Sequence, residues 1–359
     1  MKALRIAIFA AVPVVLLLAV FGGLARAGVA APTTDTIAAW HGPLFVCGFF
    51  GAVISLERAV ALGLGWAYAA PALAAAGGLA ILAGAGLALA SGLFVAAGAV
   101  LLAASVAVWL RQKALHTRVL AVAAGCWVAG SLAWGATGEV AVALPAWAGF
   151  LVLTIAGERL ELTRLLPRSP SAKTLFLAPM VLLLLGIAIG FAMPVAGGKA
   201  VAIALAGLAL WLLAFDIARV TIAQPGLARY IAACLITGYA WLVLAALLWF
   251  AAGFLFHGAR PYYDAAVHAV FVGFVLSMVF GHAPVILPSV ARIRIAFTPF
   301  AYAALTLLHA TLALRIVGDL AGEDGWRRWG ALGNALALAL FALTMAFSAR
   351  RMKAAATHG

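Results

Sequence analysis

Residues 264–288 read DAAVHAVFVGFVLSMVFGHAPVILP, an apolar run that is long enough to cross a bilayer as one helix. After Asp264 the run contains no Asp, Glu, Lys or Arg. It does contain His268 and His282, two polar side chains that are costly to place in hydrocarbon. They are 14 residues apart, so a regular α-helix places them near one face and roughly 20 Å apart along its axis. This run predicts a membrane helix whose histidines are candidates for a functional site.

The rest of the chain has the same apolar character. Of its 359 residues 67% are hydrophobic and only 9% are charged, and the mean hydropathy is +1.18. Repeated apolar runs of about 20 residues are typical of a polytopic helical membrane protein. Ten-residue segments of alternating hydrophobicity, the signature of a β-barrel, do not occur in the sequence. We therefore expect an all-α fold and a single integral membrane domain over residues 1–359.

Twelve membrane-spanning helices are expected, joined by short connections in which Pro, Gly and charged residues gather. Glu-Arg pairs end the second and sixth of them, which suggests a repeat of three pseudo-symmetric four-helix arcs. The expected spans cover roughly residues 4–25, 37–63, 67–90, 92–110, 115–137, 140–163, 174–193, 200–222, 229–254, 264–290, 296–317 and 327–349.

The positive charge follows the membrane topology. The formal net charge is +13, and most of the 23 Lys and Arg residues fall at alternate ends of the apolar runs. This asymmetry predicts that both termini are cytoplasmic. The expected location of the protein is a bacterial-type inner membrane. It also argues against nucleic acid as a partner. The first apolar run imitates a signal peptide but is longer than the usual apolar core of one, so we expect a retained helix.

Two histidines occupy equivalent places in their spans. His41 and His268 each lie about four residues into a span from its outer end, so they are expected at one depth. Two neutral imidazoles from facing helices at one depth are what a bis-histidine b-type haem requires. Gly48 follows His41 by two turns and would let a flat macrocycle approach the backbone. Arg26 and Arg260, in the adjacent outer loops, are candidate partners for the haem propionates.

Other histidines are weaker candidates for metal or haem binding. His282 and His309 lie in antiparallel neighbouring spans and are candidates for a second metal, either copper or a second haem. In each case the alternative is a histidine that only hydrogen-bonds a neighbouring helix. His116 is expected to be solvated, and His257 is a candidate for a residue near the outer site.

Acidic residues are rare within the spans. Glu57 and Glu158 are each followed by Arg, and structural pairing at the cytoplasmic interface is the favoured explanation. Glu57 is also the first candidate for proton uptake, because it shares a span with His41. Asp216 and Arg219 have the spacing of an i, i+3 ion pair.

Two segments carry a resemblance to known families. Trp40-His41-Gly42 opens a glycine-rich second span, and the tenth span combines His268-Ala269 with Gly273, Met278 and Gly281. These features resemble the NnrS family of haem- and copper-associated membrane proteins. More distantly, they are similar to the catalytic subunit of haem–copper oxidases and nitric oxide reductases, which has twelve helices.

The second of these resemblances implies a haem-ligand role for His41 and His268. It does not extend to a binuclear centre, since the sixth and seventh spans contain no histidine.

Together these features predict a membrane b-type haem protein. It would transfer electrons to or from a redox partner, or bind or process a small diatomic ligand such as nitric oxide. If it is an enzyme, it is a haem-dependent oxidoreductase. Two alternatives remain: a haem-free transporter or channel, and a non-catalytic assembly subunit of a respiratory complex. The absence of an acidic residue at mid-depth argues against the transporter.

Overall fold

A computed structural model describes residues 2–163, 171–255, 261–291 and 295–357 of the chain. Within these ranges, twelve helices are long and apolar enough to cross a membrane, which confirms the all-α polytopic fold. They are Arg5–Arg26, His41–Leu62, Gly65–Leu82, Leu87–Gln112, Leu115–Thr137, Val140–Leu162, Ala172–Gly190, Pro194–Phe215, Leu227–Ala252, Tyr262–Pro288, Ala301–Ala321 and Asp324–Arg350.

The helices gather in two compact units, residues 1–158 and residues 159–359. Of the helices in the described ranges, the first six spans thus fall mainly in unit 1 and the last six in unit 2, so they do not group as the expected three sets of four. Unit 1 contains α1 (Lys2–Arg26), α2 (Asp35–Ala39), α3 (His41–Pro43), η1 (Leu44–Phe50), α4 (Gly51–Leu62), η2 (Gly65–Tyr68), α5 (Ala69–Leu82), α6 (Leu87–Gln112), α7 (Leu115–Thr137) and most of α8 (Val140–Leu162).

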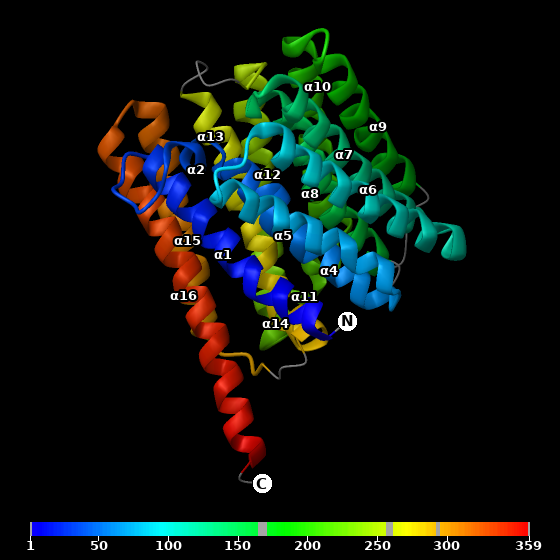
Figure 1. Ribbon diagram of the computed structural model, residues 1–359, viewed down its shortest axis with the longest axis vertical. Helices are drawn as coiled ribbons and strands as arrows, with labels where there is room; N and C mark the ends of the chain where they lie inside the picture. Colours follow the sequence, from blue (N-terminus) through cyan, green and yellow to red (C-terminus); the bar gives the residue numbers. More distant parts are fainter. Residues whose placement is uncertain (1, 164–170, 256–260, 292–294, 358–359) are drawn as a thin grey trace. The chain divides into compact units, whose positions relative to one another are not determined.

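Unit 2 begins at Arg159, in the last turn of α8. Its other elements are α9 (Ala172–Gly190), α10 (Pro194–Phe215), α11 (Ala218–Thr221), α12 (Leu227–Ala252), α13 (Tyr262–His268), η4 (Ala269–Leu276), α14 (Ser277–Ala291), α15 (Ala301–Ala321) and α16 (Asp324–Thr357). The final turns of α16 run past the other helices of the unit (Figure 1).

Small residues let the helices of unit 1 approach closely. Helix α1 packs along η1 and α5, and α6 packs along α7. A Cβ atom added at Gly51 would lie 2.6 Å from Cη2 of the Trp127 ring, so this glycine makes room for a large aromatic side chain. Trp127 is fully buried and stacks on Phe150 with a centroid distance of 5.1 Å. Glycine contacts of this kind drive helix association where there is no hydrophobic effect to do so.

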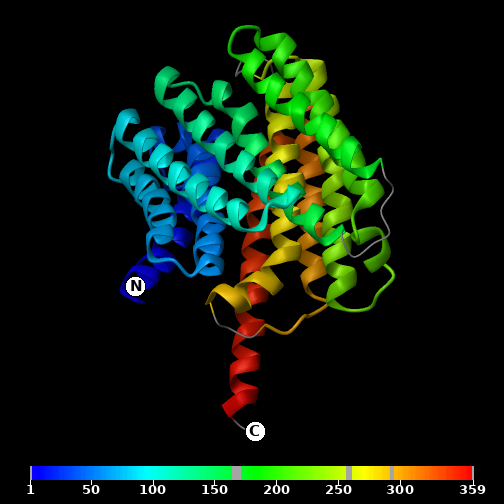
Figure 2. The same cartoon turned by 90° about the vertical axis from the view of Figure 1, so that its right-hand side faces the viewer.

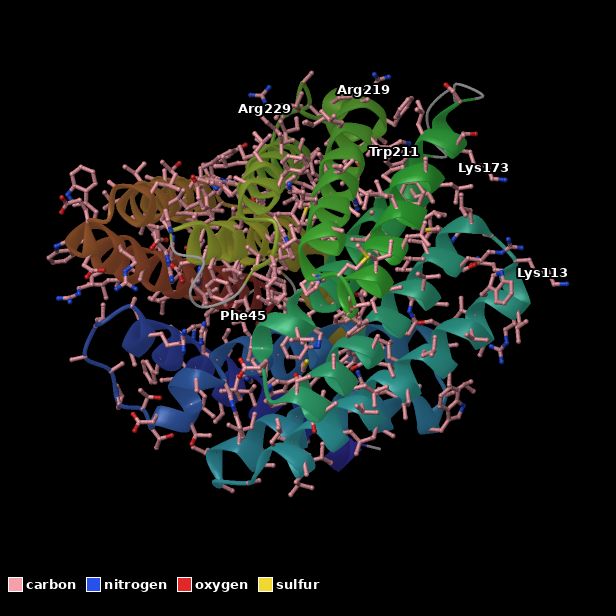
Figure 3. All side chains as sticks on the ribbon, turned by 90° about the horizontal axis from the view of Figure 1, so that it is seen from above. Phe45, Lys113, Lys173, Trp211, Arg219 and Arg229 are labelled. Atoms are coloured by element: carbon pink, nitrogen blue, oxygen red, sulfur yellow. The ribbon has the colours of Figure 1, made fainter. Side chains whose placement is uncertain are left out.

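Unit 2 is arranged around α12, which contacts α10, α13, η4 and α14. Helices α9 and α10 run side by side in the same unit (Figure 2), and the indole nitrogen of Trp211 in α10 donates to the Ala172 carbonyl of α9 at 2.8 Å (Figure 3). A Cβ atom at Gly273 in η4 would lie 2.6 Å from Cγ of Trp241 in α12. The π-helical segment is therefore held directly against α12.

Helices α15 and α16 of unit 2 pack closely against each other. A Cβ atom at Gly330 would lie 2.6 Å from the backbone nitrogen of Arg315, and one at Gly318 would lie 2.6 Å from that of Arg327. The backbones of the two helices therefore touch at two levels. Between these levels there is no room for lipid.

Candidate functional site

The two histidine spans have the same local construction. His41 begins α3, and the π-helix η1 follows at Leu44–Phe50. His268 ends α13, and the π-helix η4 follows directly at Ala269–Leu276. π-helical segments are rare and frequently occur at functional sites. Nothing in the sequence indicates them, because apolar residues fill every face of both segments.

The protonation of both imidazoles follows from their partners. Nδ1 of His41 lies 2.9 Å from the carbonyl oxygen of Ala38, and Nδ1 of His268 lies 2.8 Å from that of Asp264. A carbonyl oxygen only accepts hydrogen bonds, so Nδ1 carries the proton in each ring. The lone pair is then on Nε2, which is the usual arrangement for a histidine that ligates a metal.

The π-helix η4 changes the relation between His268 and His282. The expectation of a shared face assumed 3.6 residues per turn throughout, whereas eight of the intervening residues are π-helical. A π turn, with its i to i+5 hydrogen bonds, holds more residues, so the α-helical period does not apply across this segment. The 14-residue separation of His268 and His282 therefore no longer implies that they share one face of the helix.

Gly48 is used for helix packing. A Cβ atom added there would lie 2.7 Å from Cγ1 of Val15 in α1, and the His41 ring packs against Gly22 and Gly23 of the same helix. Gly48 and His41 do face the same way, as predicted, but the space at Gly48 is filled by a valine side chain. Its expected role in admitting a macrocycle has no support from these contacts.

The cations expected near the haem propionates are only partly described. Arg26 is the exposed last residue of α1 and lies one turn beyond Gly22, at the same end of unit 1 as His41. Arg260 and His257 lie outside the described residues. No group of three or more His, Cys, Asp or Glu side chains suited to a metal ion occurs in the part of the chain that the structure describes, although a bis-histidine haem needs only two.

His309 has the opposite protonation from the other span histidines. Its Nδ1 accepts a hydrogen bond from the Trp241 indole at 2.8 Å, so its proton is on Nε2, which lies 2.9 Å from Oγ1 of Thr237. Both ring nitrogens are thus occupied, and a metal would have to displace one partner. A second metal at His282 and His309 remains a prediction that the contacts of His309 do not support.

His268 belongs to a buried ionic network, which we call the outer network. Its Nδ1 lies 3.4 Å from Oδ1 of Asp264, and two guanidinium nitrogens of Arg315 donate to Oδ2 of the same carboxylate at 3.0 and 2.9 Å. Asp319 lies beside the carboxyl group of Asp264, and Nε of Arg327 lies 3.9 Å from Oδ1 of Asp319. Arg315 and Asp264 are 51 residues apart in the sequence, so no local spacing pattern could have paired them.

The outer network places two carboxyl groups side by side. Asp264 and Asp319 are near enough to interact electrostatically, and their side chains are only 18% and 3% exposed. Arg315 contacts the first carboxyl group and Arg327 faces the second. The outer network is therefore a buried group of paired acidic and basic side chains beside His268.

A second buried group of polar residues lies at the other end of unit 2. We call it the inner polar cluster, and it consists of Arg159, Asp216, Tyr239 and His282. Asp216 faces Arg159 across 4.0 Å, not Arg219 as predicted. Arg219 is exposed and points away from the helices of the unit (Figure 3). Helix α10 ends at Phe215, so the backbone turns at Asp216 and an i, i+3 helical pairing does not form.

His116 and the three cysteines lie outside these polar groups. His116 is 5% exposed in the first turn of α7, so the expectation that it is solvated was wrong. Charged neighbours in the sequence do not show which face of a helix a residue occupies. The three cysteines, Cys47, Cys126 and Cys234, are free and buried.

The fold and its buried polar groups define a multi-pass α-helical membrane protein with intramembrane histidines and carboxylates. The chain belongs to the family described as Domain of unknown function (DUF8744), whose model matches residues 5–350. No curated protein and no solved structure matches the chain in the corresponding searches.

Proposed function

We propose that this protein is a membrane b-type haem protein in which His41 and His268 bind haem iron. The haem would transfer electrons or bind a small diatomic ligand such as nitric oxide. The observation that carries the proposal is the shared construction of the two histidines. Each has Nδ1 directed at a backbone carbonyl within the preceding turn, and each is followed by a π-helix.

The residues fit an iron centre in their donor chemistry. Ligating histidines almost always donate their other ring N–H to a carbonyl or carboxylate group, which fixes the ring and makes it a better ligand. His41 has a carbonyl partner, and His268 has both a carbonyl and a carboxylate partner. The haem would supply the redox chemistry, while these second partners hold the ligand atoms in place.

The test is the absorbance spectrum of the purified full-length protein together with its haem content. We expect a Soret band, and we expect His41→Ala and His268→Ala each to change it. One shared iron predicts that either variant converts a six-coordinate spectrum to a five-coordinate one. Two separate irons predict that each variant loses half of the haem.

His309→Gln is the matched control, because both nitrogens of His309 already have protein partners. It should leave the Soret band unchanged. A protein that is folded but has no Soret band, or a band that neither His41→Ala nor His268→Ala alters, would sink the proposal.

One observation favours a second candidate, a haem-free proton-coupled transporter. The sequence argued against it because no acidic residue lies at mid-depth, but the outer network holds two neighbouring buried carboxyl groups, Asp264 and Asp319. Such intramembrane carboxyl groups are typical of proton relays in transporters. Substrate-driven proton flux in proteoliposomes prepared without haem or metal, abolished by Asp319→Asn, would favour this candidate over the haem protein.

A further inference from the structure

The inner polar cluster brings together side chains from four segments of unit 2. Arg159 is in the last turn of α8, and Asp216 caps α10. Tyr239 is in α12 and His282 is in α14, two helices that pack against each other. Arg159 is near enough to act electrostatically on the His282 ring. The same end of the unit carries Arg219, and by the distribution of basic residues we expect it to face the cytoplasm.

Every member of the cluster has a buried polar atom without a hydrogen-bond partner among the described residues. These atoms are Nε of Arg159, Oδ2 of Asp216, the hydroxyl group of Tyr239 and Nε2 of His282. The side chains of Arg159 and Asp216 are 8% and 1% exposed, and Tyr239 is completely buried. The Tyr239 hydroxyl approaches the Asp216 carboxylate but does not complete a hydrogen bond.

Leaving even one buried polar group unpaired costs about 1–3 kcal/mol, so four together call for a missing partner. The four atoms are complementary in type. Arg159 offers an N–H donor, Asp216 offers an acceptor, and Tyr239 offers both. Nδ1 of His282 donates to the Met278 carbonyl at 2.7 Å, which leaves Nε2 as an acceptor. Two donors and two or more acceptors are the set that water, with two of each, can satisfy.

The spacing also suits water. Nε of Arg159 and Oδ2 of Asp216 are 4.0 Å apart, too far for a direct hydrogen bond. One water oxygen can lie about 2.8 Å from both atoms at that separation. We propose that the inner polar cluster binds ordered water and holds an exchangeable proton.

Asp216 is the group suited to take that proton. It follows the last residue of the span Pro194–Phe215, and burial raises the pKa of its carboxyl group, although Arg159 opposes this shift. Oδ1 accepts a hydrogen bond from the backbone nitrogen of Ala218 at 2.6 Å, so Oδ2 is the oxygen that faces the cluster. Two further titratable groups of α12, Tyr230 and Cys234, interact with each other, and Cys234 packs against Gly281 of α14.

The experiment is infrared difference spectroscopy of the full-length protein in lipid nanodiscs, recorded between two pH values. We expect the C=O band of a protonated carboxyl group that shifts in D₂O and is lost in Asp216→Asn. We also expect an O–H band of internal water that shifts in H₂¹⁸O. Tyr239→Phe should keep the carboxyl band at a changed frequency and lose the water band.

Asp35→Asn is the matched control, since Asp35 is an exposed carboxylate in α2 of unit 1. Its difference spectrum should equal that of the unaltered protein. Persistence of the carboxyl band in Asp216→Asn, or the lack of a band sensitive to H₂¹⁸O, would overturn the proposal. Should Asp216→Asn fail to fold, an unchanged spectrum in Tyr239→Phe would do so. The measurement needs no haem, so the proposed function can fail without affecting this result.

Discussion

The span that carries His41 in unit 1 and the span that carries His268 in unit 2 share a backbone plan but differ in what lies behind the imidazole. Both rings donate Nδ1–H to a carbonyl of the preceding turn, and both precede a π-helix. His41 packs against glycines of α1, whereas His268 also meets the Asp264 carboxylate and, through it, Arg315. The same imidazole orientation therefore occurs in an apolar environment at His41 and in an ionic environment at His268.

This difference has a chemical meaning for the proposed haem. A carboxylate behind a ligating histidine makes the ring a more basic ligand than a carbonyl alone does. His268 would therefore be the more basic of the two proposed ligands.

The largest expected effect is a loss of stability when the outer network beside His268 is broken. Arg315→Met removes the cation that two hydrogen bonds join to Asp264 and leaves a buried carboxylate unpaired. Breaking a buried pair in this way costs about 3–5 kcal/mol of stability. Unfolding in a detergent titration measures it, with the exposed Arg328→Ala as the control, for which we expect a change within about 0.5 kcal/mol. Equal stability of the two variants would show that the outer network is not structural.

The next effect concerns the ligand strengths. Asp264→Asn keeps the backbone carbonyl behind His268 but removes the negative charge. We expect haem affinity to fall about 10- to 100-fold, the usual effect of losing such a partner. Haem titration of the apoprotein measures it. Asp35→Asn, at an exposed carboxylate, should bind haem as the unaltered protein does, and an equal loss in both variants would contradict the assignment.

The two π-helical spans should respond alike to overpacking. Gly51→Ala would press a methyl group into the Trp127 ring, and Gly273→Ala would press one into Trp241. Each should cost about 1–3 kcal/mol in the same unfolding titration. At Gly92 in α6 nothing lies within 4 Å of an added Cβ atom, so Gly92→Ala should be neutral or stabilising by up to about 1 kcal/mol. A large loss in one span only would show that the two are not equivalent.

The smallest effect should separate His309 from the proposed ligands. Thr237→Val removes the acceptor for Nε2–H of His309 and costs about 1 kcal/mol of stability. Because His309 is not a proposed iron ligand, the Soret band should not move. A spectral change of the size seen in His268→Ala would return His309 to the candidate metal ligands.

The sequence predicted the spans well and the polar contacts poorly, for separate reasons. Hydropathy locates a helix because every apolar residue in it contributes, so all twelve expected spans have a counterpart in the structure, although the third ends at Leu82 and not near residue 90. The switch to π-helix at η1 and η4 leaves no trace in a run that is apolar on all faces. Asp264 with Arg315 and Asp216 with Arg159 join distant helices, and sequence spacing showed only near neighbours such as Arg219.

The close packing of α15 against α16 has a consequence for biosynthesis. Charged residues are costly to insert into a membrane as part of a lone apolar helix, most of all near its centre. Arg327 at the start of α16 lies beside Asp319 at the end of α15 and beside Asp324, so the two helices offset each other's charges when they enter the bilayer as a hairpin. The partner of Arg315 is on α13, which is synthesised earlier. Insertion of the α15–α16 hairpin therefore depends on an α13 that is already in the membrane, because Asp264 of α13 pairs with Arg315.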